Sequence, residues 1–170
     1  MTEYVLITDF ARAQADKLRD MTGGKRLYPV NLEPAVRCLG AELWECEGLG
    51  SGLVGALVDK RVDDAPVIFV NTSETVFWQR FSVACMLGHI MEREHRGLGD
   101  KYSYLHMTHS PVPTEPYSYY VERFTLEFLA PPSKVRELLG EGRPVPYMVG
   151  VFGVPLPKLV WWVEEYQTRI

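Results

Sequence analysis

One segment in the middle of the chain, residues 74–94, constrains the fold more than any other. Apolar and small residues recur in it at spacings of three and four, which predicts an α-helix with a broad buried face. The residues of that face are Phe77, Phe81, Ala84, Cys85, Gly88 and Met91. Ser73 is a candidate N-cap for this helix. A helix buried this broadly requires other elements packed around it.

Three short segments before this helix predict strands. Residues 41–46 alternate apolar and polar side chains, as a half-buried strand does. Residues 53–59 and 65–71 are rich in strand-forming residues, and the polar residues 60–64 connect them. Because the three segments follow one another with short connections, we expect a small three-stranded antiparallel meander.

Helical patterns occupy most of the remaining chain. The predicted ranges are 9–21, 30–40, 117–132, 132–140 and two helices within 145–167. Asp9 is a candidate cap for the first of them, and residues 96–116 read as an irregular loop. With no repeat and no linker, the order of elements predicts one α+β domain over residues 1–170. In it, the small sheet packs against the long helix, and the C-terminal part is helical.

The composition narrows the possible functions. Among 170 residues, 46% are hydrophobic and 24% are charged, as in an ordinary globular protein, and the net charge of −4 argues against nucleic-acid binding. A DNA-contacting role through Lys158 and Arg169 is therefore only a minor alternative. No segment has the apolar length of a membrane span. Three cysteines, Cys38, Cys46 and Cys85, fit no disulfide framework, so we expect a cytoplasmic protein in which they are small buried residues.

Cys85 and His89 are spaced like two metal ligands on one face of a helix. A zinc-peptidase helix carries H-E-x-x-H, in which both histidines bind one Zn²⁺ and the glutamate takes a proton from the metal-bound water. Thiolate and imidazole both bind zinc. Met86, however, occupies the position of the general base, and loss of such a base costs about 10²–10⁴-fold in rate. The alternative interpretation is a buried cysteine and a hydrogen-bonded histidine.

An ordered set of motifs resembles the ImmA/IrrE family of zincin-like peptidases from bacteria, phages and mobile elements. The family carries a strand ending in I-x-V-N and then R-F-T-x-A-H-E-L-G-H, and this chain carries VIFVN (67–71) and RFSVACMLGH (80–89). Downstream, SYYVERFTLEFLAPP (118–132) resembles the family's E-x-x-A-N-x-F-A-x-x-L-L-M-P, and VFGVPLPKLVWWV (151–163) resembles its last helix. The front of the chain, YPVNLEPAVRCLGAELWE (28–45), is similar to P-V-D-x-x-x-x-A-x-x-L-G-I-x-V.

The resemblance implies a zincin-like fold whose catalytic positions are degenerate. The first zinc histidine corresponds to Cys85, the base to Met86, the second histidine to His89, and the third ligand, a glutamate, to Ser118. Three of these four functional positions have changed while the packing residues around them are kept. We therefore expect a pseudoenzyme without a bound metal or other cofactor. Tyr102, Tyr104 and the tyrosines of 117–120 are expected to fill the volume that metal and water would have taken.

Family members typically cleave a helix-turn-helix repressor of a phage, mobile element or stress response. By resemblance, we expect this chain to bind such a repressor without cleaving it, as a regulatory module that contacts neither DNA nor a membrane. The alternative is an active metalloprotease with a rewired zinc site, formed by Cys85 and His89. The groups considered to complete that site are His106, His109, Glu115 and Glu122.

Overall fold

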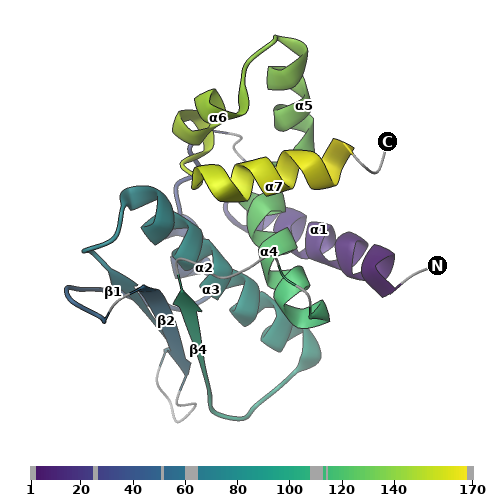
Figure 1. Ribbon diagram of the computed structural model, residues 1–170. Helices are drawn as coiled ribbons and strands as arrows, with labels where there is room; N and C mark the ends of the chain where they lie inside the picture. The colour runs from purple at the N-terminus through teal and green to yellow at the C-terminus, as the bar shows by residue number, and fades with distance from the viewer. Residues whose placement is uncertain are drawn as a thin grey trace.

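The computed structural model describes residues 3–24, 27–50, 52–59, 65–107, 113 and 115–167. Seven helices and four strands form this part of the chain (Figure 1). The helices are α1 (Glu3–Met21), α2 (Glu33–Cys38), α3 (Val76–Arg96), α4 (Pro116–Leu129), α5 (Pro132–Gly140), α6 (Val145–Phe152) and α7 (Leu156–Gln167). The strands are β1 (Glu42–Cys46), β2 (Leu53–Asp59), β3 (Val67–Asn71) and β4 (Tyr102–Met107). The architecture is α+β.

The sheet differs from the predicted antiparallel meander. Its four strands lie in the order β1-β3-β2-β4, with β1 parallel to β3 and with β2 antiparallel to both β3 and β4. The meander prediction is wrong because β2 is already paired on both sides, which leaves the free edge of β3 for β1. The predicted loop at 96–116 is also wrong in part, since β4 lies within it and pairs Leu105 with Ala56 of β2.

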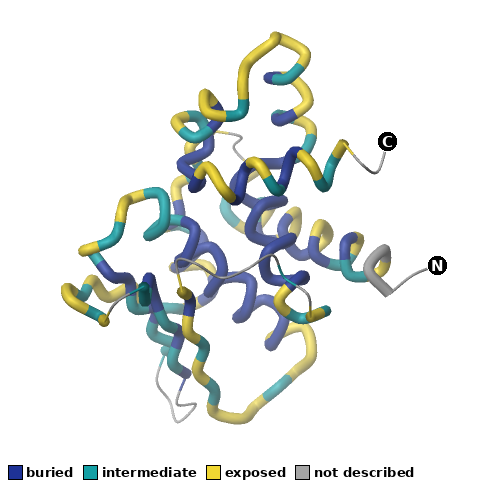
Figure 2. Tube along the Cα trace, in the orientation of Figure 1, coloured by how far each residue is buried: buried dark blue, intermediate teal, exposed yellow. Residues whose placement is uncertain are grey.

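The long helix α3 is the centre of the molecule, as its periodicity predicts. Every residue from Phe81 to Arg93 is buried, and the helix contacts β2 and β3 of the sheet as well as α4 and α1 (Figure 2). Thr75, rather than Ser73, is the N-cap residue. The helix ends at Gly97, whose φ of 63° gives the left-handed conformation common after a helix C-terminus.

The packing of α3 on α4 is close enough to require a glycine. A Cβ atom on Gly88 would lie 2.7 Å from Cδ1 of Phe124 on α4. The absence of a side chain at this position therefore sets how near the two helix axes approach, and with it the distance from α3 to the tyrosines of α4.

The helices at the two ends of the chain cover α4. α1 begins at Glu3, so Asp9 lies inside that helix and is not its cap. In α7, Trp162 is fully buried and donates a hydrogen bond from Nε1 to the carbonyl oxygen of Ala130 at 2.8 Å, while Trp161 is only partly covered. Among the described residues, no helix combines the length and apolar character that crossing a membrane requires.

Candidate functional site

Of the three cysteines, Cys85 is buried as expected, at the interface of α3 and α4, whereas Cys38 is exposed and Cys46 is half-buried, so the expectation is wrong for those two. Cys85 is 3% exposed, and the Thr125 hydroxyl is within hydrogen-bonding distance of its sulfur, at 3.4 Å. Burial raises the pKa of the Cys85 thiol to about 12, and the nearby carboxylate of Glu122 acts in the same direction. A metal-binding or nucleophilic cysteine must ionise, so this environment opposes both roles.

Met86 and His89 are the other two predicted site positions on α3. Met86 is fully buried in the hydrophobic core, and its thioether cannot take a proton from water. The ring of His89 stacks on Tyr104 of β4, with 3.8 Å between centroids and 8° between planes. Its Nδ1 atom shares a hydrogen bond of 2.7 Å with the hydroxyl of Tyr117.

The surroundings of His89 keep its imidazole neutral. Burial, together with the nearby His106 and Arg93, lowers the pKa of His89 to about 3. One ring nitrogen is hydrogen-bonded and one ring face is covered by an aromatic side chain. His89 is thus a hydrogen-bonded buried histidine and Cys85 a buried small residue, as the alternative interpretation of the pair expects.

The aromatic cluster around His89 comes from two elements. Tyr104 of β4 lies 5.9 Å from Tyr117 of α4 and 5.5 Å from Tyr102, measured between ring centroids. The hydroxyl of Tyr120 donates to the Gly88 carbonyl oxygen at 3.3 Å. Tyr104, Tyr117 and Tyr120 thus lie beside His89 and Gly88, as expected, whereas Tyr119 donates to Glu165 of α7 and does not join them.

Ser118 does not join the other predicted positions. It is exposed on α4, whereas its neighbour Tyr117 faces α3 and contacts His89. The helical period alone predicts that Tyr117, rather than Ser118, faces α3. Phe124 packs against Gly88, and Tyr117 lies seven residues, or about two turns, before it on the same face.

The described residues proposed to complete a rewired metal site do not form a group of three that could hold a metal ion. His106 is buried against Phe81 and Trp78, with ring centroids 5.8 Å and 6.2 Å away. Glu122 is buried and paired with Lys158 of α7, with 2.6 Å between Oε1 and Nζ. Glu115 is exposed, and His109 lies outside the described residues.

The pairing with Glu122 also decides the role of Lys158. Its side chain is 7% exposed and lies over the ring of Phe81, with 5.5 Å from Nζ to the centroid. A buried, ion-paired lysine is poorly placed to contact a DNA phosphate, which disfavours a DNA contact through this residue. Arg169, its suggested companion, lies outside the described residues.

The chemistry of these side chains does not fit a catalytic zinc ion. The thiol has a raised pKa, the imidazole is hydrogen-bonded to a tyrosine, and a thioether stands at the position of the base. Within the part of the chain that the structure describes, no three His, Cys, Asp or Glu side chains lie close enough to share a metal ion. The local arrangement is that of a packed core with hydrogen-bonded polar groups.

Two comparisons with known sequences found no relative of this chain. A scan against protein-family models found no match to this chain, and a search of curated proteins found none either. The function is therefore inferred from the residues themselves.

Proposed function

We propose that this protein is a non-catalytic, zincin-like member of the ImmA/IrrE group that binds a helix-turn-helix repressor of a phage, mobile element or stress response. One observation carries the proposal. The positions that would hold zinc and water are occupied by a neutral thiol, a thioether and a histidine enclosed by Tyr104 and Tyr117. A protein that keeps the scaffold and fills its centre in this way retains surfaces for binding but no group for hydrolysis.

The outer face of the sheet offers a surface for a protein partner. The strand registers place Trp44, Phe69, Ala56 and Leu105 in one row across the four strands. Trp44 is 53% exposed and Leu105 is 70% exposed. Large exposed apolar side chains grouped on one face are typical of interaction sites, and tryptophan is enriched among the residues that dominate binding energy.

The position of Trp44 is fixed before a partner arrives. Its Nε1 donates to Oε2 of Glu42 at 2.8 Å, and its ring meets that of Phe69 edge-on at 5.9 Å. An anchor that is already held loses little side-chain entropy on binding.

The charge beside this surface suits a basic partner. Glu42, Glu45 and Glu47 are all exposed on and just after β1, and this stretch carries no basic residue. Proteins that bind DNA present lysine and arginine toward phosphates. A repressor whose basic surface is covered by this acidic strand cannot contact its operator, so sequestration alone would relieve repression.

The first test measures metal and cleavage together. The protein is purified without chelators beside Cys85→Ala, metal is quantified by mass spectrometry, and each is incubated with the purified helix-turn-helix protein encoded next to its gene. We expect little zinc in either protein, an intact repressor, and a stable complex by size-exclusion chromatography. Stoichiometric zinc that is lost in Cys85→Ala, with cleavage of the repressor, would establish the rewired protease instead.

The second test locates the surface. Trp44→Ser and Leu105→Ser should weaken the complex by about tenfold or more, since tryptophan anchors commonly contribute 2 kcal/mol or more. Val160→Ser on α7, which replaces an apolar residue that is 39% exposed elsewhere, is the matched control and should bind as the wild type does. Equal losses in all three variants would contradict docking on the sheet.

A further inference from the structure

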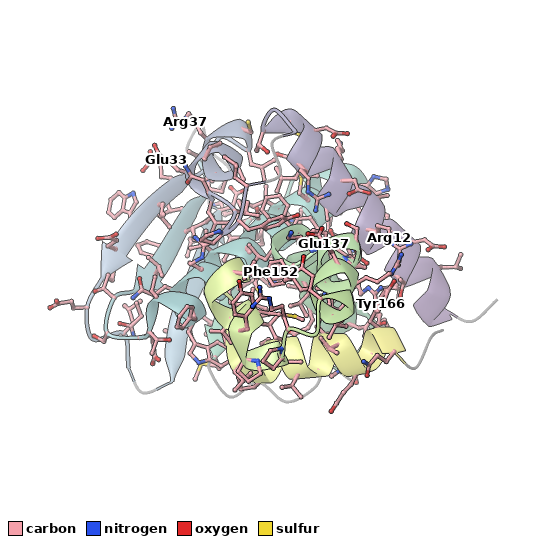
Figure 3. The ribbon with its side chains drawn as sticks, turned by 90° about the horizontal axis from the view of Figure 1, so that it is seen from above. Arg12, Glu33, Arg37, Glu137, Phe152 and Tyr166 are labelled. Atoms are coloured by element: carbon pink, nitrogen blue, oxygen red, sulfur yellow. The ribbon has the colours of Figure 1, made fainter. Side chains whose placement is uncertain are left out.

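A hollow lies between helices α1, α4, α5 and α7. It has a volume of about 330 Å³ and is lined by three arginines, Arg12, Arg19 and Arg136, together with Ser133 and Tyr166. Figure 3 shows Arg12 of α1 and Tyr166 of α7 on the same side of the molecule, away from Arg37 of α2. We refer to this hollow as the arginine pocket.

The charges in the arginine pocket do not cancel. Its two carboxylates are Asp16 and Glu127, and Glu127 is already bound from below by Arg123, with 3.2 Å from Nε and 3.0 Å from Nη2 to Oε1. Among the described residues that line the pocket, three guanidinium groups against two carboxylates leave an excess of one positive charge. Asp9 lies 3.9 Å from Arg12 but is largely exposed and therefore offsets little of it. This excess stands out in a chain with a net charge of −4.

Two of the guanidinium groups are held in place. Arg19 donates from Nη2 to the carbonyl oxygen of Glu127 at 2.8 Å and is paired with Asp16 through Nη1. Arg136 donates to the hydroxyl of Tyr166 and lies over the same ring, 5.4 Å from its centroid. Donors that are already oriented lose little entropy when an anion binds.

The start of α5 adds to the positive potential. No side chain caps this helix, and its first turn contains no acidic residue. The backbone N–H groups of Lys134 and Val135 both donate to the carbonyl oxygen of Pro131, while Ser133 lines the pocket. The positive end of the helix dipole therefore lies beside the arginines.

The remaining wall of the pocket is not charged. Pro131 and Pro132 line it together with the ring of Tyr166. The hollow is also larger than a single oxyanion requires, and its volume is at the lower end of the range for small-molecule sites. These walls suit an apolar or aromatic group attached to the anion.

We propose that the arginine pocket binds a phosphate monoester of a small organic molecule. A monoester carries about −1.5 to −2 charges at pH 7 and presents three acceptor oxygens to the three guanidinium groups of the pocket, whereas a carboxylate presents two oxygens and one charge. Guanidinium forks match the oxygens of phosphate in pairs. The organic part of the molecule packs against Tyr166 and the two prolines. This site is independent of repressor binding on the sheet.

The probes that test it are phenyl phosphate and inorganic phosphate, titrated into the isotope-labelled full chain and followed by amide chemical shifts. We expect phenyl phosphate to shift the amides of Ser133, Arg136 and Tyr166 and to bind more tightly than inorganic phosphate. Affinity should fall between pH 7 and pH 5, because the second pKa of a phosphate monoester is about 6.

The variants Arg12→Gln and Arg136→Gln should each weaken binding of phenyl phosphate by about tenfold or more, the usual effect of losing a charge-assisted hydrogen bond. Arg37→Gln is the matched control, since Arg37 is exposed on α2 and paired only with Glu33 in the described structure. Thermal unfolding verifies that all three variants fold. No binding of either probe, equal affinity for both, or an unchanged affinity in Arg136→Gln would each overturn the proposal.

Discussion

The buried contact between α4 and α7 and the arginine pocket use ionisable side chains in opposite ways. At the contact, Glu122 meets Lys158 at 2.6 Å, and both side chains are almost completely buried. In the pocket, Arg12 and Arg136 are exposed, and together with Arg19 the arginines outnumber the two carboxylates among the described lining residues. In the buried contact, each of the two charges is paired with the other. In the arginine pocket, the guanidinium groups outnumber the carboxylates.

The difference follows from the presence of water. An unpaired charge in a protein interior costs several kcal/mol, so buried charges occur in pairs. Water and salt screen charges at the surface, where an excess is tolerated and stays available to a ligand. The buried contact should therefore determine the stability of the molecule, and the pocket should contribute to binding with little effect on stability.

The largest expected change in the free energy of unfolding comes from replacing Lys158. Lys158→Met leaves the carboxylate of Glu122 buried without its partner, and it should lower the free energy of unfolding by about 3–5 kcal/mol. The double variant Glu122→Met, Lys158→Met removes both charges and should recover most of that loss. Urea denaturation measures all three proteins. A double variant as unstable as the single one would show that packing, not charge, decides this contact.

A smaller loss of stability is expected from a substitution at the uncharged contact between α3 and α4. Gly88→Ala places a Cβ atom 2.7 Å from Phe124, and such overpacking should cost about 1–3 kcal/mol. Gly150→Ala in α6 is the control, because a Cβ atom there has no neighbour within 4 Å. It should stabilise the protein by about 0.5–1 kcal/mol through helix propensity. If Gly88→Ala were neutral, the two helices would have room to separate.

The pH dependence of stability that arises from His89 gives a further comparison between the buried region and the open arginine pocket. Its pKa is about 3 in the folded protein and about 6.5 when unfolded, so the unfolded chain binds the extra proton first as pH falls. This contribution to stability is complete above pH 6.5 and decreases toward pH 3. Between pH 7 and pH 5, the wild type should lose about 2 kcal/mol more than His89→Gln does.

Denaturant unfolding of both proteins at the two pH values measures this difference. Glutamine retains a hydrogen-bonding group for Tyr117 but cannot be protonated, which makes it the suitable replacement. Equal losses in the two proteins would mean that His89 is accessible to water and protons, and the region around it would then be as open as the arginine pocket.

The smallest effect on stability is expected in the pocket itself. Arg12 is half exposed and its ion pairs with Asp9 and Glu127 are long, so Arg12→Gln should change the free energy of unfolding by less than about 1 kcal/mol. Added salt should reduce even this difference. A loss as large as that of Lys158→Met would remove the distinction between the two regions.

Much of the helical structure was predictable from local patterns. The spacing of apolar residues gave α3 and its buried face, and Pro131 marked the end of α4. In α7, the two adjacent tryptophans divided into one buried and one partly covered residue, as a helix exposed on one side requires. Helix boundaries were less accurate, since Asp9 and Ser73 are not the caps that their residue types suggested.

Strand pairing was not predictable in the same way. The segment that forms β4 follows a glycine-rich stretch and precedes several prolines, and these signals favoured a loop. It becomes a strand because β2 offers a free edge, and that edge exists only after the sheet has formed. The parallel pairing of β1 with β3 has the same cause.

The sequence by itself determined which chemistry the centre of α3 lacks. Met86 cannot act as a base in any fold, and Cys85 and His89 share a helix face wherever that helix lies. Only the tertiary structure decided what these residues do instead. It placed Tyr104 and Tyr117 around His89 and paired Lys158 with Glu122. It also brought the arginines of α1 and α5 together beside one hollow, where they outnumber the carboxylates among the described lining residues. The reason is physical, because helical periodicity acts between neighbours in the chain, whereas pKa values, ion pairs and pockets depend on groups brought together from distant segments.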